Sequence, residues 1–317
     1  MPQVSVIIAI YNVEAYIERC LHSLFNQTLD DIEYIFVNDG CTDDSMKILH
    51  KVLNQYPFRH EQVKIINHSK NLGIAAARIS GMKKATGVYI IHCDPDDYIE
   101  LDIYEKMYNK AKEGDFDFVA CQHDRVYKDR IEERSVIYEK TPLLCLQLNH
   151  KNEQNYSVLW DKLVKRELIE KFNIYPNEGC VINEDLSCIA RILYHAKSFS
   201  VINENLYHYY CNSSSLMSIP FDKRKFKSKI KVINFLDEYF KDKGLKTYCN
   251  WLKFNAKIQS RHLFVGREKE WYELFKECHK DIMKLKDNTF KTRMLWSVAL
   301  SKYNIFIILR KFIKVLN

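Results

Sequence analysis

Acidic side chains follow two of the apolar runs that the sequence predicts to be strands. Asp39 comes directly after the run at 33–38, and Asp94 and Asp96 follow the run at 88–93. Carboxylate oxygens in a cleft suit Mg²⁺ or Mn²⁺, which proteins hold with one or two carboxylates together with substrate phosphates. A metal ion in such a place would neutralise the charge that develops on a diphosphate leaving group. The pattern therefore favours metal-assisted chemistry on a phosphorylated substrate.

Each of these carboxylates also has an ordinary structural interpretation. Asp39 beside Gly40 is typical of a tight turn, and the D-x-D of Asp94 and Asp96 includes a proline, which is frequent in turns. Taken singly, these residues do not distinguish a binding site from a turn. Their order and spacing along the chain, taken together, are what favour a site.

The first 125 residues alternate short apolar runs with amphipathic runs of helical spacing. This alternation is typical of a parallel sheet with crossover helices, and the nearly continuous apolar runs indicate strands that are covered on both faces. The sequence therefore predicts an α/β, Rossmann-like fold with a mostly parallel sheet and helices on both faces. The predicted strands are residues 4–10, 33–38, 63–67, 88–93 and 116–121.

The loops that follow these strands are where we expect chemistry, because a ligand of such a sheet sits at the carboxyl ends of the strands. Tyr11 and Asn12 follow the first predicted strand and thereby join the carboxylates at this edge.

The remainder of the chain is less regular. Residues 126–157 are predicted to form an irregular segment outside the regular alternation. A helix is predicted at about 160–172, and a second helix begins near Asn183. Two short strands are predicted at 199–202 and 206–209. Helical patterns then dominate, so we predict a domain at 1–217, made of a regular half at 1–125 and a less regular half at 126–217, and a helical region at 218–317.

Several motifs together resemble the family 2 glycosyltransferases of the GT-A fold. The resemblance covers about residues 1–217 and implies an inverting transfer from a nucleotide-sugar donor. Its later motifs are similar to those of members that act in capsule, exopolysaccharide or lipopolysaccharide synthesis. The motifs are SVIIAIYN at 5–12, SLFNQT at 23–28, EYIFVNDGCTDDS at 33–45, NLGIAAAR at 71–78, GVYIIHCDPDD at 87–97, WDKLVKREL at 160–168 and NEDLSCIARIL at 183–193.

The resemblance implies a nucleoside site after the first two strands. Ala9, Tyr11, Asn12 and Asp39 are its expected residues. Tyr11 would stack near the base, and the Asp39 carboxylate would accept a hydrogen bond from uracil.

The same resemblance implies a diphosphate and metal site. Lys70 and Arg78 are expected on the nucleotide and phosphate side, where cations suit the diphosphate charge. Asp96 would bind Mn²⁺ or Mg²⁺, and Asp94 would contact the ribose or the sugar.

Asp185, in the Glu184-Asp185 pair, is the expected catalytic base. An inverting transfer needs one carboxylate in line with the acceptor hydroxyl, opposite the leaving diphosphate. The alternative is that Asn183, Glu184 and Asp185 form an ordinary helix N-terminus. The upstream motifs favour catalysis by Asp185 and give Glu184 a lesser part.

Three further residues are weaker acceptor-side candidates. Trp160 suits the apolar face of a sugar but also suits a core, and Lys162 lies two residues further on in the same motif. His208 falls where relatives place a residue near the diphosphate, although a hydrogen-bonded structural histidine is the favoured interpretation.

The net charge of +7 is unevenly distributed. Residues 221–317 carry 24 basic and 10 acidic side chains, so the preceding residues are net acidic. The 290–317 segment mixes cations with aromatic and aliphatic residues, as interfacial helices do. This segment favours contact with a membrane surface over packing on its own domain or on a second subunit. The acidic first two thirds, and the lack of any recognised module, exclude nucleic acid as the expected partner.

The ten cysteines are scattered without a C-x-x-C pair, which indicates reduced thiols. The N-terminal residues lack the pattern of a signal peptide, and no apolar run is long enough to span a bilayer. We therefore expect a cytoplasmic protein, with the tail favouring peripheral contact on the inner face of the cytoplasmic membrane.

The sequence thus predicts a metal-dependent inverting glycosyltransferase, either hexosyl or N-acetylhexosaminyl. Its expected donor is a UDP-sugar, and its acceptor is a hydroxyl of a glycan or a polyprenyl-linked oligosaccharide in bacterial surface polysaccharide synthesis. Two alternatives remain open: a non-catalytic subunit that binds nucleotide-sugar or glycan, and a sugar-1-phosphate nucleotidyltransferase. Against the latter, residues 11–14 lack the Gly-rich, Lys-containing phosphate loop that it requires.

Overall fold

The computed structural model describes residues 1–152, 156–212 and 219–281. The chain divides into two compact units. The first comprises residues 1–145 and 154–220, and the second comprises residues 146–153 and 221–317. The first unit contains every residue for which the sequence predicts a site, and each unit is described by itself below.

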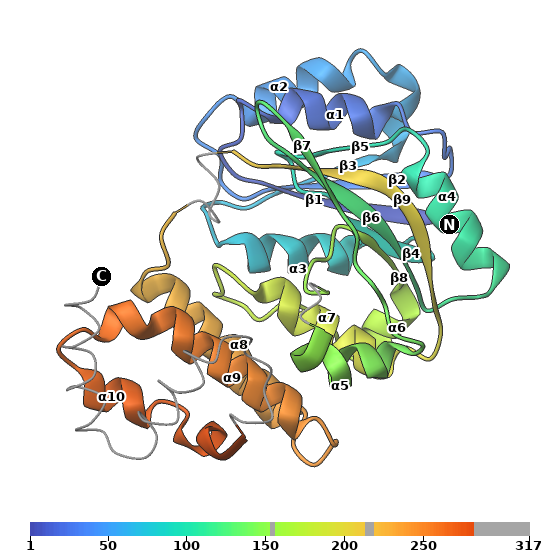
Figure 1. Cartoon of the computed structure of the whole chain (residues 1–317). Coiled ribbons are helices and arrows are strands. Elements are labelled where there is room, and N and C mark those ends of the chain that lie inside the picture. Colours follow the sequence, from blue (N-terminus) through green and yellow to red (C-terminus); the bar gives the residue numbers. More distant parts are fainter. Residues whose placement is uncertain (153–155, 213–218, 282–317) are drawn as a thin grey trace. The chain divides into compact units, whose positions relative to one another are not determined.

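The first unit is built on one mixed sheet, whose strand order is β3-β2-β1-β4-β8-β6-β9-β5, with β7 paired to β6 (Figure 1). The α/β fold with a mostly parallel sheet, predicted from the alternating pattern, is confirmed. The strands are β1 (Val4–Ile10), β2 (Ile32–Asn38), β3 (Val63–Asn67), β4 (Tyr89–His92), β5 (Tyr98–Ile99), β6 (Phe118–Val126), β7 (Ile131–Arg134), β8 (Lys162–Lys165) and β9 (Phe199–Tyr210).

Helices cover both faces of this sheet (Figure 1). Val4, Val6 and Ile8 of β1 join the large apolar core with α1 and α2 on one face. Ile7 points to the opposite face, where α3 approaches so closely that a Cβ on Gly81 would lie 2.5 Å from the Ile7 side chain. The helices of the first unit are α1 (Ile17–Phe25), α2 (Ser45–Leu53), η1 (Pro57–Gln62), α3 (Ile74–Lys84), α4 (Ile103–Glu113), α6 (Arg166–Lys171) and α7 (Glu184–His195). Helix α5 (Pro142–Asn152) begins in the first unit, and most of it belongs to the second.

Strand direction decides where the loops meet. β1 is parallel to β2 and β4, and β2 is parallel to β3. Because β8 is antiparallel to both β4 and β6, these two strands run the same way, and β9 is parallel to β6. The carboxyl ends of β1, β2, β3, β4, β6 and β9 therefore share one edge of the sheet, and the loops after them can form a single site.

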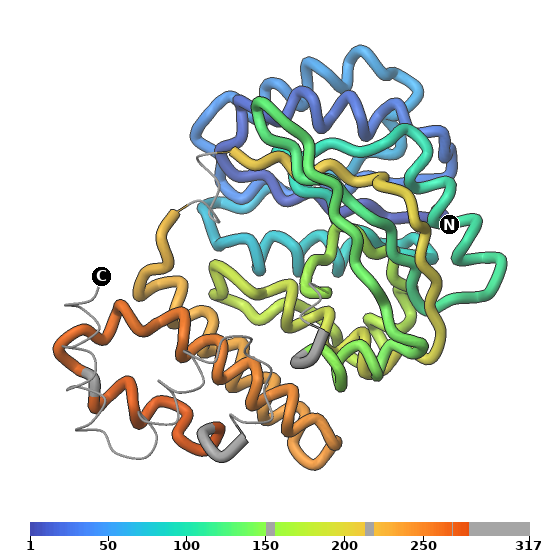
Figure 2. Tube along the Cα trace, in the orientation of Figure 1, coloured from blue at the N-terminus to red at the C-terminus, as the bar shows by residue number. Residues whose placement is uncertain are grey.

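Two local predictions differ from the structure. Within the predicted helix at 160–172, Lys162–Lys165 forms β8 and only Arg166–Lys171 is helical. Pairing with β4 and β6 on either side overrides the local helical pattern. The strands predicted at 199–202 and 206–209 are one strand, β9, which pairs with β6 with a register shift near Gln122. The tubes of β6 and β9 run side by side in Figure 2.

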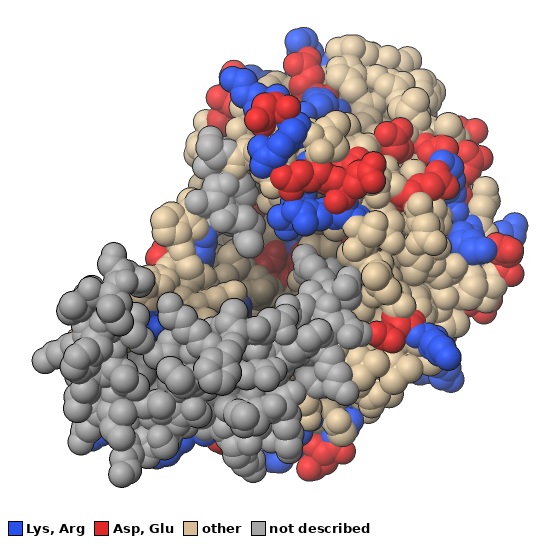
Figure 3. Space-filling model, viewed as in Figure 1, with Lys and Arg blue, Asp and Glu red and all other residues tan. Residues whose placement is uncertain are grey.

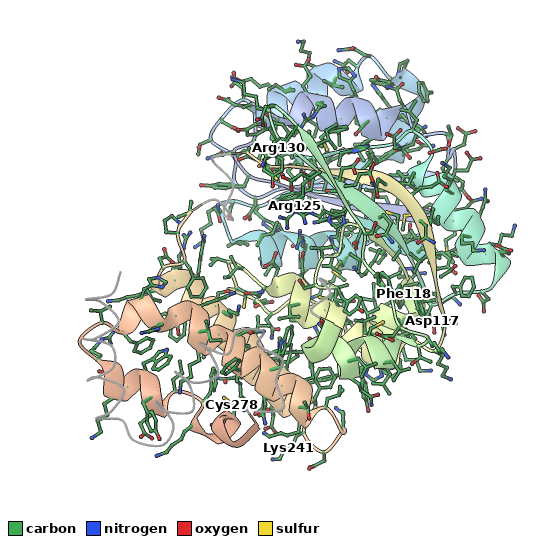
Figure 4. All side chains as sticks on the ribbon, viewed as in Figure 1. Asp117, Phe118, Arg125, Arg130, Lys241 and Cys278 are labelled. Atoms are coloured by element: carbon green, nitrogen blue, oxygen red, sulfur yellow. The ribbon has the colours of Figure 1, made fainter. Side chains whose placement is uncertain are left out.

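The second unit is helical where the structure describes it. Its elements are α8 (Lys223–Tyr239), α9 (Lys246–Ser260), η2 (Arg261–Phe264), α10 (Glu268–Glu273) and η3 (Lys276–Asp281). The Asp222 side chain accepts a hydrogen bond from Lys225 N at 2.8 Å and so caps α8. Phe254, Trp271 and Cys278 form a small core, and Cys278 is labelled in Figure 4.

Within residues 1–152, 156–212 and 219–281, no helix combines the length and apolar character needed to cross a membrane. The segment 290–317, for which the sequence predicts membrane contact, lies outside the described residues. All ten cysteines lie inside them, and none forms a disulfide.

Glu33 of β2 joins several parallel strands through its buried carboxylate. It accepts hydrogen bonds from Ser5 Oγ at 2.5 Å, Thr86 N at 2.6 Å and Lys64 Nζ at 2.5 Å. Burial raises the pKa of Glu33, but these hydrogen bonds outweigh burial and hold the pKa below its ordinary value of 4.5. The ionised form therefore stabilises the folded state.

We expect Glu33→Gln to lower the free energy of unfolding at pH 7 by about 1.5–3 kcal/mol, because charged hydrogen bonds are lost. The folded-state pKa lies below the unfolded value. The stabilisation is therefore present above pH 4.5 and is lost as the pH falls through the folded pKa. Urea denaturation across this range should show the two proteins converging at acid pH. Glu204→Gln, at the exposed pair with Lys106, is the control and should change stability by less than about 1 kcal/mol.

Candidate active site

The loop after β1 is braced against the loop after β2. Asn12 adopts a positive φ of 51°, and its Oδ1 accepts a hydrogen bond from Thr42 N at 2.9 Å. Tyr11 beside it is 45% exposed, so its ring is free to stack on a ligand, whereas Ala9 is nearly buried in β1. Ala9, Tyr11 and Asn12, which the sequence predicts to contact the nucleoside, thus lie at or just after the carboxyl end of β1.

Asp39 is buried, and its carboxylate organises the loop that follows β3. Oδ1 accepts hydrogen bonds from Leu72 N at 2.9 Å and lies 2.7 Å from His68 Nδ1, and Oδ2 accepts from Gly73 N at 2.8 Å. A carboxylate offers about four lone-pair positions. Oδ2 therefore keeps room for one more donor, as the predicted hydrogen bond from a base requires.

Gly40 allows the loops after β2 and β3 to touch. Its φ is +73°, and a Cβ at this position would lie 2.7 Å from Asn71 N and from the carbonyl carbon of Lys70. Any other residue would be strained and would also push the loops apart. Lys70 itself is exposed beside this contact.

Arg78 of α3 is buried and bridges three carboxylates. Nη2 donates to Asp94 Oδ1 at 2.8 Å, and Nη1 donates to Glu184 Oε1 at 2.8 Å and to Asp185 Oδ1. Glu184 and Asp185 occupy the first turn of α7, and Asp94 follows β4. Despite burial, the charges of Asp94 and Glu184 keep the pKa of Arg78 above its ordinary value. One guanidinium thus brings together the D-x-D and the predicted base.

The D-x-D loop crowds carboxylates in a partly buried place. Burial, and after it the charge of Asp94, raise the pKa of Asp96 to about 6. Burial and the charges of Asp96 and Asp94 also raise the pKa of Asp97 well above its ordinary value. Asp97 accepts hydrogen bonds from Tyr207 Oη at 2.6 Å and from Tyr210 N at 2.7 Å. It is therefore a structural carboxyl that the end of β9 holds.

The donor set fits a hard divalent cation that is shared with a substrate. Among the described residues, no three His, Cys, Asp or Glu side chains converge on one metal position. Asp96 is partly buried, and its Oδ2 accepts a hydrogen bond from Asn212 Nδ2 at 2.8 Å. Mg²⁺ and Mn²⁺ bind through one or two carboxylates and complete their shell with phosphates and water. Asp96, with Asp94 nearby, meets that requirement.

The acceptor-side candidates are more enclosed. Trp160 is 5% exposed, and its ring stacks on Tyr207 at 4.2 Å between centroids. Lys162 is buried, and its Nζ donates to Asp161 Oδ1 at 2.6 Å and to Val158 O at 2.9 Å. The structure therefore places the Lys162 ammonium in an internal ion pair, and its acceptor role stays a prediction.

His208 is also held by neighbouring side chains. Its Nε2 lies 2.9 Å from Glu100 Oε1, its Nδ1 lies 3.2 Å from Asp124 Oδ2, and its ring stacks on Tyr98 at 4.6 Å between centroids. These contacts agree with the interpretation of His208 as a hydrogen-bonded structural histidine.

Sequence comparison decides the family. The sequence model of Glycosyl transferase family 2 matches residues 5–171, more than half of the chain. The chain belongs to this family. The region that matches includes β1 to β4, the D-x-D loop and α3.

Three curated relatives support the same assignment. The uncharacterized glycosyltransferase EpsJ of Bacillus subtilis is 34% identical, over 70% of this chain and 64% of EpsJ. The putative glycosyltransferase EpsH of the same organism is 32% identical, over 76% of this chain and 73% of EpsH. The cholesterol galactosyltransferase of Borreliella burgdorferi is 31% identical, over 83% of this chain and 76% of that protein.

Solved structures of low identity share the fold. The S. aureus TarS 1-349 crystal structure, in complex with UDP-GlcNAc, matches with a TM-score of 0.71 and 21% identity, over 89% of this chain and 82% of that chain. The mannosyltransferase PcManGT of Pyrobaculum calidifontis, in complex with GDP-Man and Mn²⁺, matches with a TM-score of 0.58 and 15% identity, over 82% and 72% of the two chains. The GT-A fold predicted from the motifs is confirmed.

Two neighbours of this glycosyltransferase site were missed by sequence reasoning. Tyr207 Oη accepts a hydrogen bond from Asp94 N at 3.1 Å while it donates to Asp97, and Asn212 donates to Asp96. Both residues come more than 100 positions after the D-x-D. Their contacts arise from the pairing of β9 with β5 and β6, which no local pattern reveals.

We expect Arg78→Met to lower the free energy of unfolding by about 3–5 kcal/mol, because it leaves buried carboxylates without their cation. Urea denaturation at pH 7 measures this change. Arg134→Met is the matched control, since Arg134 is 46% exposed and pairs with Glu132 at the surface, and it should cost less than about 1 kcal/mol. Equal losses for the two variants would contradict the bridging role of Arg78.

Proposed function

We propose that the chain is a metal-dependent inverting glycosyltransferase that moves a sugar from a UDP-sugar to a hydroxyl group. The observation that carries the proposal is the Arg78 cluster. Because Asp94 and Asp185 contact the same guanidinium, the donor-side loop and the base candidate lie within a few ångströms of each other. Inverting transfer requires this proximity of a metal-side carboxylate and a base.

In the proposed mechanism each residue has a separate task. Tyr11 and Asp39 hold the nucleoside at the ends of β1 and β2, and Asp96 holds Mn²⁺ or Mg²⁺, with Asp94 directed to the ribose or sugar. When bound, the metal supplies positive charge against the leaving diphosphate. Asp185 takes the proton from the acceptor hydroxyl as that oxygen attacks the anomeric carbon from the opposite side. Lys70 and Arg78 add positive charge on the phosphate side.

The donor and acceptor classes rest on chemistry and on similarity. A free acceptor position on Asp39 Oδ2 suits the N–H of uracil, and TarS, which shares the fold, binds UDP-GlcNAc. We propose a hexose or N-acetylhexosamine as the sugar and a glycan or polyprenyl-linked oligosaccharide as the acceptor. The similarity to the minor teichoic acid biosynthesis protein GgaB, at 29% identity, supports a role in bacterial surface polysaccharide synthesis.

The proposed organisation assigns donor binding to 1–125, acceptor binding to 126–217 and attachment to 218–317. Trp160, Lys162, Glu184 and His208 would then shape the acceptor half, either in contact with the acceptor or by supporting such contacts. Tail residues 290–317 would hold the enzyme on the inner face of the cytoplasmic membrane, next to a lipid-borne acceptor.

The catalytic proposal is tested by Asp185→Asn. Without its base the enzyme should lose about 10²- to 10⁴-fold in kcat, because general base catalysis typically contributes that much. Calorimetry should show UDP binding that depends on Mn²⁺ and stays close to wild type. Glu204→Gln, at the exposed pair with Lys106, is the control and should retain wild-type turnover. Unchanged sugar transfer by Asp185→Asn would overturn the assignment.

The donor is identified by a screen of nucleotide sugars for metal-dependent hydrolysis, with product analysis on lipid-linked acceptors. UDP binding that depends on Mn²⁺ but comes with no transfer to any acceptor would support a binding subunit instead. Formation of a nucleotide sugar from a sugar 1-phosphate would support a nucleotidyltransferase.

The attachment proposal has its own test. Deletion of residues 290–317 should release the protein from vesicles that contain anionic phospholipid, because the six cations from 291 to 314 are removed. Co-sedimentation measures the bound fraction, and neutral phosphatidylcholine vesicles are the control. Undiminished binding of the shortened chain to anionic vesicles would refute attachment through the tail.

A further inference from the structure

Helix α1 runs along the backbone of residues 94–101, the segment that contains the D-x-D. Three of its side chains, and that of Gln27 just beyond its end, contact backbone atoms of that segment. Arg19 Nη2 donates to Asp96 O at 3.0 Å, Cys20 Sγ lies 3.7 Å from Asp94 O, Ser23 Oγ accepts from Ile99 N at 3.3 Å, and Gln27 Nε2 donates to Glu100 O at 2.8 Å. The segment is thereby fixed to one rigid element.

Arg19 differs from the other three because it is exposed to solvent. A surface arginine ordinarily has considerable side-chain freedom, which weakens any single hydrogen bond that it makes. Here the Arg19 guanidinium lies 4.5 Å from the ring centroid of Tyr98 and 4.3 Å from that of Tyr210. Cation–π contact with two rings restricts it, so its hydrogen bond to Asp96 O is held in place.

Other side chains of the protein therefore hold both the backbone carbonyl and the carboxylate of Asp96 in place without a ligand. Arg19 holds the carbonyl oxygen, and Asn212 donates to the carboxylate. The next residue, Asp97, is held by Tyr207 Oη and by Tyr210 N. Tyr210 therefore supports the loop in two ways: its backbone N–H donates to Asp97, and its ring contacts the Arg19 guanidinium.

We propose that Arg19 is a positioning residue for the D-x-D loop. Its guanidinium, in cation–π contact with Tyr98 and Tyr210, fixes the backbone of Asp96 so that the Asp96 carboxylate is presented to a divalent cation in complex with a nucleoside diphosphate. This inference rests on the proposed function, because it takes Asp96 as the carboxylate that meets the metal. Arg19 acts through Asp96 and does not itself contact the reacting atoms.

The chain offers variants that separate this role from a general effect on folding. Arg19→Lys keeps the charge but loses the planar group that stacks and donates. Tyr210→Leu removes one ring of the stack, whereas Tyr210→Phe preserves it. Arg166→Lys is the matched control, since Arg166 Nε donates to Gly87 O at 2.7 Å before β4, at the opposite end of that strand.

The probe is UDP, titrated calorimetrically into the full-length protein with and without Mn²⁺. Partners that orient a metal ligand typically contribute about 10- to 100-fold to metal affinity. We therefore expect Arg19→Lys and Tyr210→Leu to weaken UDP binding in Mn²⁺ by about tenfold or more, with metal-free UDP binding unchanged. Tyr210→Phe and Arg166→Lys should bind UDP as the wild type does in both conditions.

The outcomes are distinguishable. Wild-type affinity of Arg19→Lys in Mn²⁺ would overturn the inference and leave the proposed function intact. Equal weakening with and without Mn²⁺, together with a lowered melting temperature, would show a folding defect and would also overturn the inference. A wild-type protein whose UDP binding does not respond to Mn²⁺ would overturn the proposed function, and this inference with it.

Discussion

A single buried guanidinium organises the centre of the first unit. Moving an arginine out of water is costly unless its charge is paired and its donors are used, and Arg78 meets both conditions through Asp94, Glu184 and Asp185. Two of these partners lie more than 100 residues after Arg78 in the chain. Helix α3 can therefore be buried stably only when α7 is in place, so the two sequence halves of this unit depend on each other.

The surrounding charges explain why a cation suits this place. Three aspartates lie between positions 94 and 97, and burial, followed by the charges of the neighbouring carboxylates, raises the pKa values of Asp96 and Asp97. Arg78 neutralises one side of the group, and Arg19 reaches the other side through a carbonyl oxygen. In Figure 3, acidic and basic side chains are interspersed over the surface of this unit. Figure 4 labels two of the basic residues: Arg125 lies in β6, and Arg130 lies in the turn before β7.

The sequence predicted the elements around the candidate site better than it predicted the contacts within it. The bounds of β1 agree with the run at 4–10, because a buried parallel strand leaves a strong local pattern. The bounds of β3 agree with the run at 63–67, although this strand is only partly buried. β8 was not predicted, since its strand character comes from its neighbours. Similarly, Arg78 and Asp185 could each be named from motifs, but no spacing shows that one binds the other. The sequence also does not show that Trp160 is enclosed, because its ring stacks on Tyr207 of the distant strand β9.

The contact at Gly40 limits how the proposed donor site can change. Since the loops after β2 and β3 touch with no room for a Cβ, they form one wall of fixed width around Asp39. Under the proposed function, a different nucleobase could not be admitted by spreading this wall without losing the hydrogen bonds that orient Asp39. A new base selectivity would then arise at Tyr11, which is exposed, rather than at Asp39.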